Sequence, residues 1–158
     1  MKKAALIPIL VLAIACAGGR PGATTSSSLP GHGAISITIA PNPIVASQVS
    51  GNTYDFPFEV VVRETGGHPV NVTSVSADVY ALGGIRIGNE TYDAAKISSL
   101  GYSTSVPANG ELRYRFNPRR SVTDSHLFSN VSADVRVNAT DETGTPANAS
   151  TTVTVTRG

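Results

Sequence analysis

A strict alternation of apolar and polar residues near the C-terminus constrains the fold more than any other feature of this sequence. Every second residue between Val131 and Thr140 is valine or alanine, and polar residues occupy the positions between them. Val153 and Val155 repeat this pattern among threonines. Because successive side chains of a β-strand point to opposite faces, the period of two predicts strands with one buried and one solvated face. Residues 141–148 are the predicted connecting loop.

Short runs rich in Val, Ile, Thr and aromatic residues continue this pattern back to residue 34. No long helical period competes with them. The apolar parity shifts between Val72 and Val75, which indicates a β-bulge. Asn109-Gly110 predicts a turn, since both residues tolerate positive φ. The predicted strands and shorter extended elements lie at residues 35–40, 55–64, 70–82, 85–88, 92–97 and 112–116, besides the two C-terminal strands.

Seven or eight strands of this kind predict an all-β protein, a single antiparallel β-sandwich. From Phe58 onward the pattern resembles the immunoglobulin-like and fibronectin type III-like sandwiches of bacterial surface proteins. The resemblance depends on a Gly-Gly turn at 66–67, the segment 106–110 before an aromatic strand, and an Asp-Glu-Thr-Gly loop at 141–144. The chain departs from antibody-type domains because it has one cysteine and no tryptophan.

The N-terminus has the layout of a secretory signal peptide. A basic Met-Lys-Lys opening precedes an uncharged apolar run, residues 4–15, that ends in small residues. This run is shorter than the roughly 20 apolar residues that a membrane-spanning helix needs. We therefore expect it to be cleaved.

The end of the apolar run, Leu-Ala-Ile-Ala-Cys at residues 12–16, resembles the lipobox of bacterial lipoproteins. The commonest lipobox has leucine three positions before the cysteine, where this chain has Ala13. The resemblance implies that Cys16 is lipidated and becomes the first residue of the mature protein. The alternative is an ordinary signal peptide that leaves Cys16, the only cysteine, as a free thiol.

These observations predict three regions: a signal peptide at 1–15, a lipidated cysteine with a flexible spacer at 16–33, and the sandwich at 34–158. The spacer is rich in Gly, Ser, Thr and Pro and has few apolar residues to bury. The lipobox resemblance implies attachment to a membrane of the cell envelope. In a bacterium with two membranes this is the outer membrane, on its periplasmic or surface side; otherwise it is the outer face of the cytoplasmic membrane.

Charge and residue types argue against several functions. Removing residues 1–15 takes away two of the twelve basic residues and leaves ten against eleven acidic ones, so nothing favours nucleic-acid binding. His32, His68 and His126 are scattered and read as solvated, so no metal or other cofactor is predicted. Ser121, Asp124 and His126 are the residue types of an acyl-transfer triad, but they lie in one loop. The chain is therefore predicted not to be an enzyme.

Two charged groups are candidate binding residues. Arg113, Arg115, Arg119 and Arg120 form the only basic concentration, which could contact anionic glycans, lipid head groups or an acidic partner, unless it is simply the solvated side of an amphipathic strand. The calcium candidates are Asp124, Asp141 and Glu142. The alternative for Asp141 is that it starts a turn completed by Gly144.

The leading hypothesis is therefore a membrane-tethered envelope lipoprotein whose sandwich has a non-enzymatic binding or structural role toward an envelope protein or glycan. A carbohydrate-binding module is the first alternative, with Tyr54, Tyr92 and above all Tyr102 as candidate platforms. A protease inhibitor that presents one exposed loop is the second.

Overall fold

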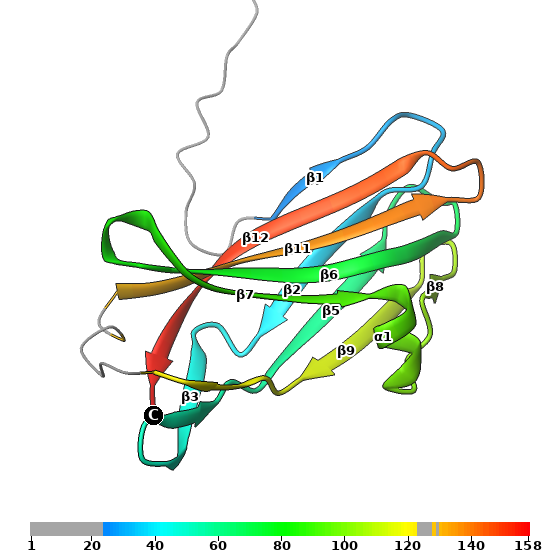
Figure 1. Cartoon of the computed structure of the whole chain (residues 1–158). Coiled ribbons are helices and arrows are strands. Elements are labelled where there is room, and N and C mark those ends of the chain that lie inside the picture. The colour runs from blue at the N-terminus through cyan, green and yellow to red at the C-terminus, as the bar shows by residue number, and fades with distance from the viewer. Residues whose placement is uncertain (1–23, 123–127, 129) are drawn as a thin grey trace, which may run out of the picture.

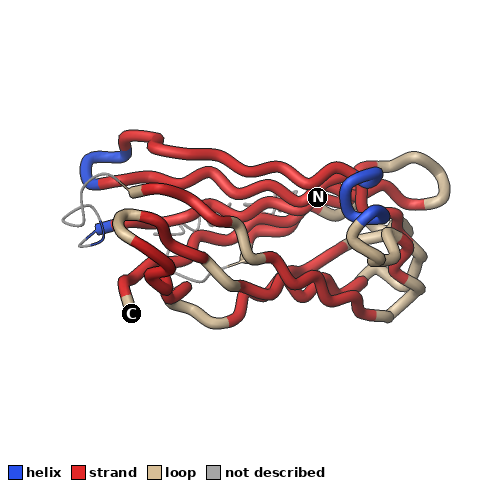
Figure 2. The backbone as a smooth tube through the Cα atoms, turned by 60° about the horizontal axis from the view of Figure 1, so that its bottom comes forward, coloured by secondary structure: helices blue, strands red, loops and turns tan. Residues whose placement is uncertain are grey.

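The computed structural model describes residues 24–122, 128 and 130–158, which form two β-sheets packed face to face (Figures 1 and 2). The smaller sheet has the order β2 (Ile35–Ala40), β5 (Phe58–Glu64), β9 (Glu111–Phe116). The larger sheet has the order β10 (Arg119–Ser121), β4 (Thr53–Asp55), β3 (Ile44–Ser50), β12 (Pro146–Arg157), β11 (Val131–Asp141), β6 (Val70–Ala81), β7 (Ile85–Asp93), with β1 (Thr25–Ser27) beside β12 and β8 (Ser105–Val106) beside β6. The predicted all-β class is confirmed.

The core lies between the two sheets and is made by the alternating residues that the sequence pattern singled out. Val60 and Val62 of β5 belong to the same core cluster as Val135 and Val137 of β11, and all four side chains are fully buried. The apolar face predicted for β11, and for Val153 and Val155 of β12, is confirmed. Burial of this apolar surface is the main force that holds the sheets together.

One strand pair departs from the antiparallel arrangement that we expected. β3 runs parallel to β12, with Ile44 opposite Val155. β3 is not predicted from sequence, because only Ile44 and Ala46 of its seven residues are buried. The last residues of β12 bend toward the smaller sheet and take β3, β4 and β10 with them (Figure 1).

The predicted irregularity in the long strand β6 is confirmed as a β-bulge. Asn138 of β11 pairs with Ser74 and the next residue pairs with Val72, so Thr73 is an extra residue. This extra residue explains the change in apolar parity between Val72 and Val75. The Asn109 turn is also confirmed, with φ of 56° at Asn109.

Two expectations about segments are wrong. Residues 85–88 and 92–97 are not two extended elements, because β7 is continuous to Asp93 and helix α1 (Ala94–Ser99) follows. The Asp93 carboxylate accepts a hydrogen bond from the Lys96 N–H at 2.7 Å and so caps this helix. The spacer predicted at 16–33 is too long, since Thr25–Ser27 pair with β12 and Gly33 is buried.

The remaining element is η1 (Leu82–Gly84), a single 3₁₀ turn that joins β6 to β7. Within the part of the chain that the structure describes, no helix has the length and apolar character to cross a membrane.

Candidate functional site

The inner face of the larger sheet is filled at one end and hollow at the other. Residues directly opposite each other on paired strands share a face, and β7 opposes β6 in the pairs Tyr92–Val75, Glu90–Ala77 and Gly88–Val79. Along β7 the inward side chain is therefore first a tyrosine, then a glutamate, then only a hydrogen. The space between the sheets widens in this direction.

The smaller sheet ends where this widening begins. Tyr92 stacks on Phe116, the last residue of β9, with ring centroids 4.1 Å apart. β5 starts at Phe58, which pairs with Phe116. Beyond this aromatic layer the larger sheet continues to Ala81 on β6 and to Val131 on β11. Among the described residues, no strand of the smaller sheet lies opposite this extension.

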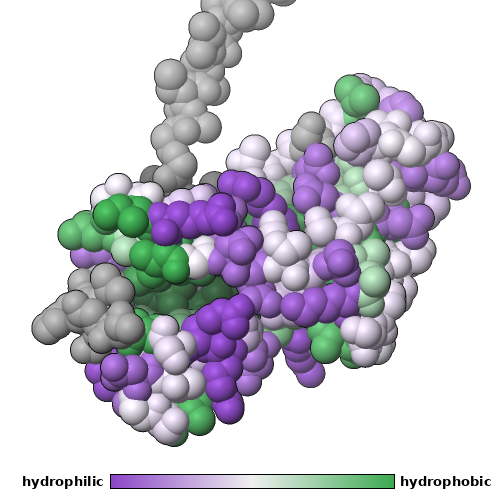
Figure 3. Space-filling view, in the orientation of Figure 1, coloured by the Kyte–Doolittle hydropathy of each residue, from purple (hydrophilic) through white to green (hydrophobic). Residues whose placement is uncertain are grey.

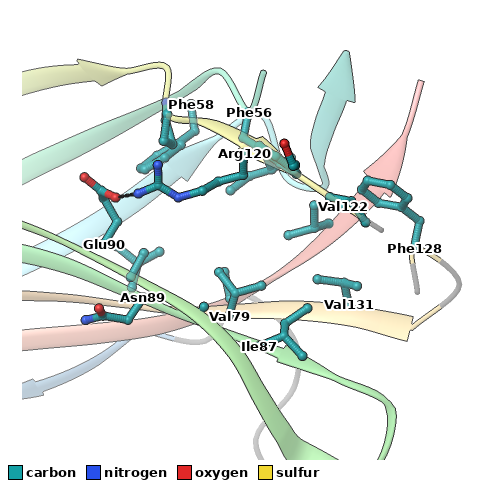
Figure 4. Close-up of a pocket in the computed structure, with 18 residues that line it drawn as sticks. Phe56, Phe58, Val79, Ile87, Asn89, Glu90, Arg120, Val122, Phe128 and Val131 are labelled. Atoms are coloured by element: carbon teal, nitrogen blue, oxygen red, sulfur yellow. Dashed lines mark hydrogen bonds and ion pairs between the residues drawn. The ribbon is translucent and has the colours of Figure 1, made fainter. Parts of the chain in front are cut away.

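The result is a pocket of about 370 Å³ at this end of the sandwich. Figure 3 shows it as a hollow with an apolar lining, and Figure 4 shows the side chains that point into it. Its lining comes from the larger sheet, from the segment around β10 and from three phenylalanines, one of which, Phe58, is the first residue of β5 in the smaller sheet. The main contributors are Ala77, Val79, Ile87, Gly88, Val131, Ala133, Val135, Phe56, Phe58, Pro118, Val122 and Phe128.

The charged residues of the lining, Glu90 and Arg120, form an ion pair (Figure 4). The second carboxylate oxygen of Glu90 accepts a hydrogen bond from Lys96 Nζ at 3.1 Å. Lys96 also lies 4.3 Å above the centre of the Tyr92 ring. Two cations thus share one carboxylate, and this group of three residues has a net charge of +1.

Arg120 is the one predicted binding arginine that lines the pocket. The other three pair with carboxylates elsewhere: Arg113 with Glu59 and Glu111, Arg115 with Glu59, and Arg119 with Asp55, at 2.6–2.9 Å. Hydrogen bonds from Arg115 and Arg113 hold the pKa of the Glu59 carboxyl below its usual value. The predicted basic concentration is therefore an alternation of opposite charges.

The candidate tyrosines do not present exposed rings. Tyr54 and Tyr92 are buried. Tyr102 is half-buried; its hydroxyl donates to the Arg115 carbonyl at 3.2 Å, and its ring meets Tyr114 edge-on with centroids 5.7 Å apart. This geometry does not provide the platform that the carbohydrate-binding alternative requires.

Asp141, the central calcium candidate, is a buried turn residue. Its carboxylate accepts hydrogen bonds from the Thr143 hydroxyl at 2.6 Å, the Thr145 N–H at 2.8 Å and the Gly33 N–H at 3.3 Å. The Thr143 hydroxyl and these backbone donors outweigh burial and hold the pKa of Asp141 well below its usual range. The Gly144 N–H donates to the Asp141 carbonyl at 3.0 Å, as the turn interpretation predicts.

The remaining candidates do not join Asp141 in a metal site. Glu142 is exposed, while Asp124 and His126 lie outside the described residues. Among the residues that are described, no three His, Cys, Asp or Glu side chains are grouped to hold a metal ion. His32 is not freely solvated as predicted, because its Nδ1 lies 3.0 Å from an Asp141 carboxylate oxygen.

The sequence reasoning missed Gly88 and Glu90, which shape the pocket and its mouth. Glu90 is a charged residue on the inward face of a strand, which is an unusual position. Which face of β7 it occupies, however, follows only from the pairing of β7 with β6. Gly88 carries no comparable signal, because a glycine between Ile87 and Asn89 also suits a turn.

Comparisons with known proteins identify the fold alone. No protein-family model and no curated protein matches the chain. The structural genomics target SoR45, solved by X-ray crystallography, is 10% identical with a TM-score of 0.54 over 81% of this chain and 90% of that one. The putative ApaA protein from Bordetella pertussis is 15% identical with a TM-score of 0.49, over 87% and 97% of the two chains. A CARDB domain from Pyrococcus furiosus is 19% identical with a TM-score of 0.32, over 79% and 96%.

The fold and the site together define an all-β sandwich with an apolar pocket on the inner face of its larger sheet, at one end.

Proposed function

We propose that this chain is a lipid-anchored protein of a bacterial cell envelope and that its β-sandwich acts by binding. The observation that carries the proposal is the N-terminal sequence: a basic start, a short apolar run and small residues directly before the single cysteine, Cys16. Two or more acyl chains on that cysteine would hold the protein on the membrane effectively permanently.

The geometry of the sandwich supports a binding role in that setting. The pocket offers apolar contact area and one charged rim, which are the elements of a small-molecule binding site. The tyrosines that would support glycan binding are buried or hydrogen-bonded, so no geometric observation favours that alternative.

Replacing Cys16 by serine is expected to abolish lipid attachment, because a serine hydroxyl does not substitute for the thiolate as a nucleophile. In a producing bacterium fed an alkyne-tagged palmitate, the wild-type chain should carry the tag and sediment with membranes. The Cys16→Ser chain should carry no tag and keep its signal peptide.

The matched control is Ala13→Leu, which restores the leucine of the commonest lipobox and should be tagged at least as well as the wild type. A Cys16→Ser chain that is still shortened and still sediments with membranes would show that the anchor is not on this cysteine.

A further inference from the structure

We propose that the pocket binds a fatty acid, with the unbranched chain against the inner face of the larger sheet and the carboxylate at Arg120. The inference specifies the ligand of the binding role proposed above and rests on that role. It does not depend on the membrane anchor.

The first support is the shape and chemistry of the interior. The pocket wall consists mostly of aliphatic and aromatic side chains, and the small residues Ala77, Gly88 and Ala133 leave space along the larger sheet. The volume of about 370 Å³ lies in the range of pockets that bind small molecules, about 300–1,000 Å³. An apolar cavity of this kind gains affinity from each methylene that leaves water, by about fourfold per CH₂.

The second support is the apolar surface beside the pocket. Ile87, at the pocket lip, is 47% exposed, and Leu82 and Ile85 of the same β6–β7 connection are more exposed still. Figure 3 shows apolar side chains at the edge of the hollow. Exposed apolar side chains that adjoin a pocket mark a route by which an apolar chain enters from a membrane or from water.

The third support is charge complementarity at the mouth. Glu90 stays paired with Lys96 when Arg120 turns part of its guanidinium toward a ligand. An arginine has five N–H donors, so Arg120 can donate to Glu90 and to a ligand carboxylate together. A single negative charge on the ligand would neutralise the net charge of +1 on Arg120, Lys96 and Glu90.

The test uses the full chain in phosphatidylcholine vesicles and dodecanoate with a diazirine at the far end of its chain. After irradiation, mass spectrometry should find the adduct on the part of the pocket away from Arg120, at residues such as Val79 and Val131. Unmodified dodecanoate, added before irradiation, should compete with the probe and reduce labelling in a saturable manner. Decanoate and octanoate should need concentrations that rise by about fourfold for each CH₂ removed.

Gly88→Phe tests the cavity itself. A Cβ at Gly88 meets no heavy atom closer than 4.0 Å, so the backbone tolerates a side chain there, and the ring fills the pocket. We expect at least a tenfold loss of labelling. Ile87→Trp, introduced from the exposed lip, should give a similar loss without disturbing the core. The control Leu100→Phe, at an exposed residue that does not line the pocket, should label like the wild type.

Arg120→Gln tests the head group. It should weaken displacement by dodecanoate about tenfold and leave displacement by the uncharged dodecanol unchanged, whereas Arg120→Lys should retain most of the preference for dodecanoate. Lysophosphatidylcholine tests whether the ligand is a membrane phospholipid instead. It should displace the probe poorly, since its phosphate is accompanied by a cationic choline.

Labelling that is undiminished in both Gly88→Phe and Ile87→Trp, or that maps to the outer face of the larger sheet, would overturn the proposal. Equal displacement by dodecanol and dodecanoate, or better displacement by lysophosphatidylcholine, would overturn the assignment of a fatty acid. The Cys16→Ser chain should label like the wild type, so a failed anchor and a failed pocket give different results.

Discussion

Replacing Glu64 by alanine is expected to lower the free energy of unfolding by about 3–5 kcal/mol, because its carboxylate accepts several hydrogen bonds and each bond to a charged group contributes about 1.5–3 kcal/mol. The Glu64 side chain is only 2% exposed. Its carboxylate accepts four backbone N–H groups, from Ala34 at 3.2 Å, Gly66 at 2.6 Å, Gly67 at 3.0 Å and Asn109 at 2.8 Å. The variant leaves these donors without their acceptor. The Ala34 N–H is buried, and a buried unpaired donor costs about 1–3 kcal/mol.

The loss should be large because these donors come from three separate segments. Ala34 precedes β2, Gly66 and Gly67 follow β5, and Asn109 belongs to the turn before β9. One carboxylate thus joins the same end of all three strands of the smaller sheet. Gly66 is packed so closely that an added Cβ would lie 2.3 Å from the His32 carbonyl oxygen, so the turn cannot easily move to satisfy its own donors.

Urea unfolding at pH 7, followed by circular dichroism, measures this effect. The matched control is Glu111→Ala on neighbouring β9, whose carboxylate pairs with Arg63 and Arg113 at the surface and should contribute much less. Equal losses in the two variants would show that the backbone donors around residue 64 find water or another acceptor.

Most of the sandwich could be predicted from sequence because its strands bury one face. In β11 the buried valines and alanines occupy every second position. In β6 the bulge at Thr73 is visible in the sequence as a change in which alternate positions are apolar. β3 was not predicted because it lacks the alternation of apolar and polar residues. Its exposed side includes Val45 and Val49, which are as apolar as the residues on its buried side. Its parallel pairing with β12 is a long-range contact that no local pattern reports.

The candidate site could not be predicted in the same way, because a pocket depends on what is missing opposite a strand. Gly88 hollows the inner face only because β7 pairs with Val79 on β6 and the smaller sheet has already ended. Arg120 was identified as a candidate, but its neighbour Arg119 has the same residue type and pairs with Asp55 instead. Glu64 did carry a signal: it continues the parity of the buried residues Val60 and Val62.

Acid is expected to destabilise this fold steeply below about pH 5, through the two buried carboxylates Glu64 and Asp141. Burial alone would raise the pKa of Glu64, but its four backbone donors together outweigh that effect and lower it. Asp141 has a lowered pKa for the related reasons given above. Both pKa values are therefore lower in the folded chain than in the unfolded chain. Their contribution to stability is complete above the unfolded pKa and is lost as the pH falls toward the folded pKa.

The melting temperature should accordingly vary little between pH 7 and pH 6 and then fall toward pH 3. Surface pairs such as Arg119–Asp55 contribute in the same direction, because Arg119 also lowers the pKa of Asp55, but salt screens them. The scan is therefore made in about 1 M NaCl, where the Debye length is about 3 Å.

Asp141→Asn isolates one of the two groups. This variant should melt at a lower temperature than the wild type at pH 7, because the asparagine amide accepts fewer of the donors around residue 141. It should also lose less stability between pH 7 and pH 3, because the titrating group is gone. Glu142→Gln, at the exposed neighbouring residue, should keep the wild-type pH dependence. If Asp141→Asn lost as much stability in acid as the wild type, the turn around Asp141 would not be a source of the acid sensitivity, and Glu64 would have to account for it.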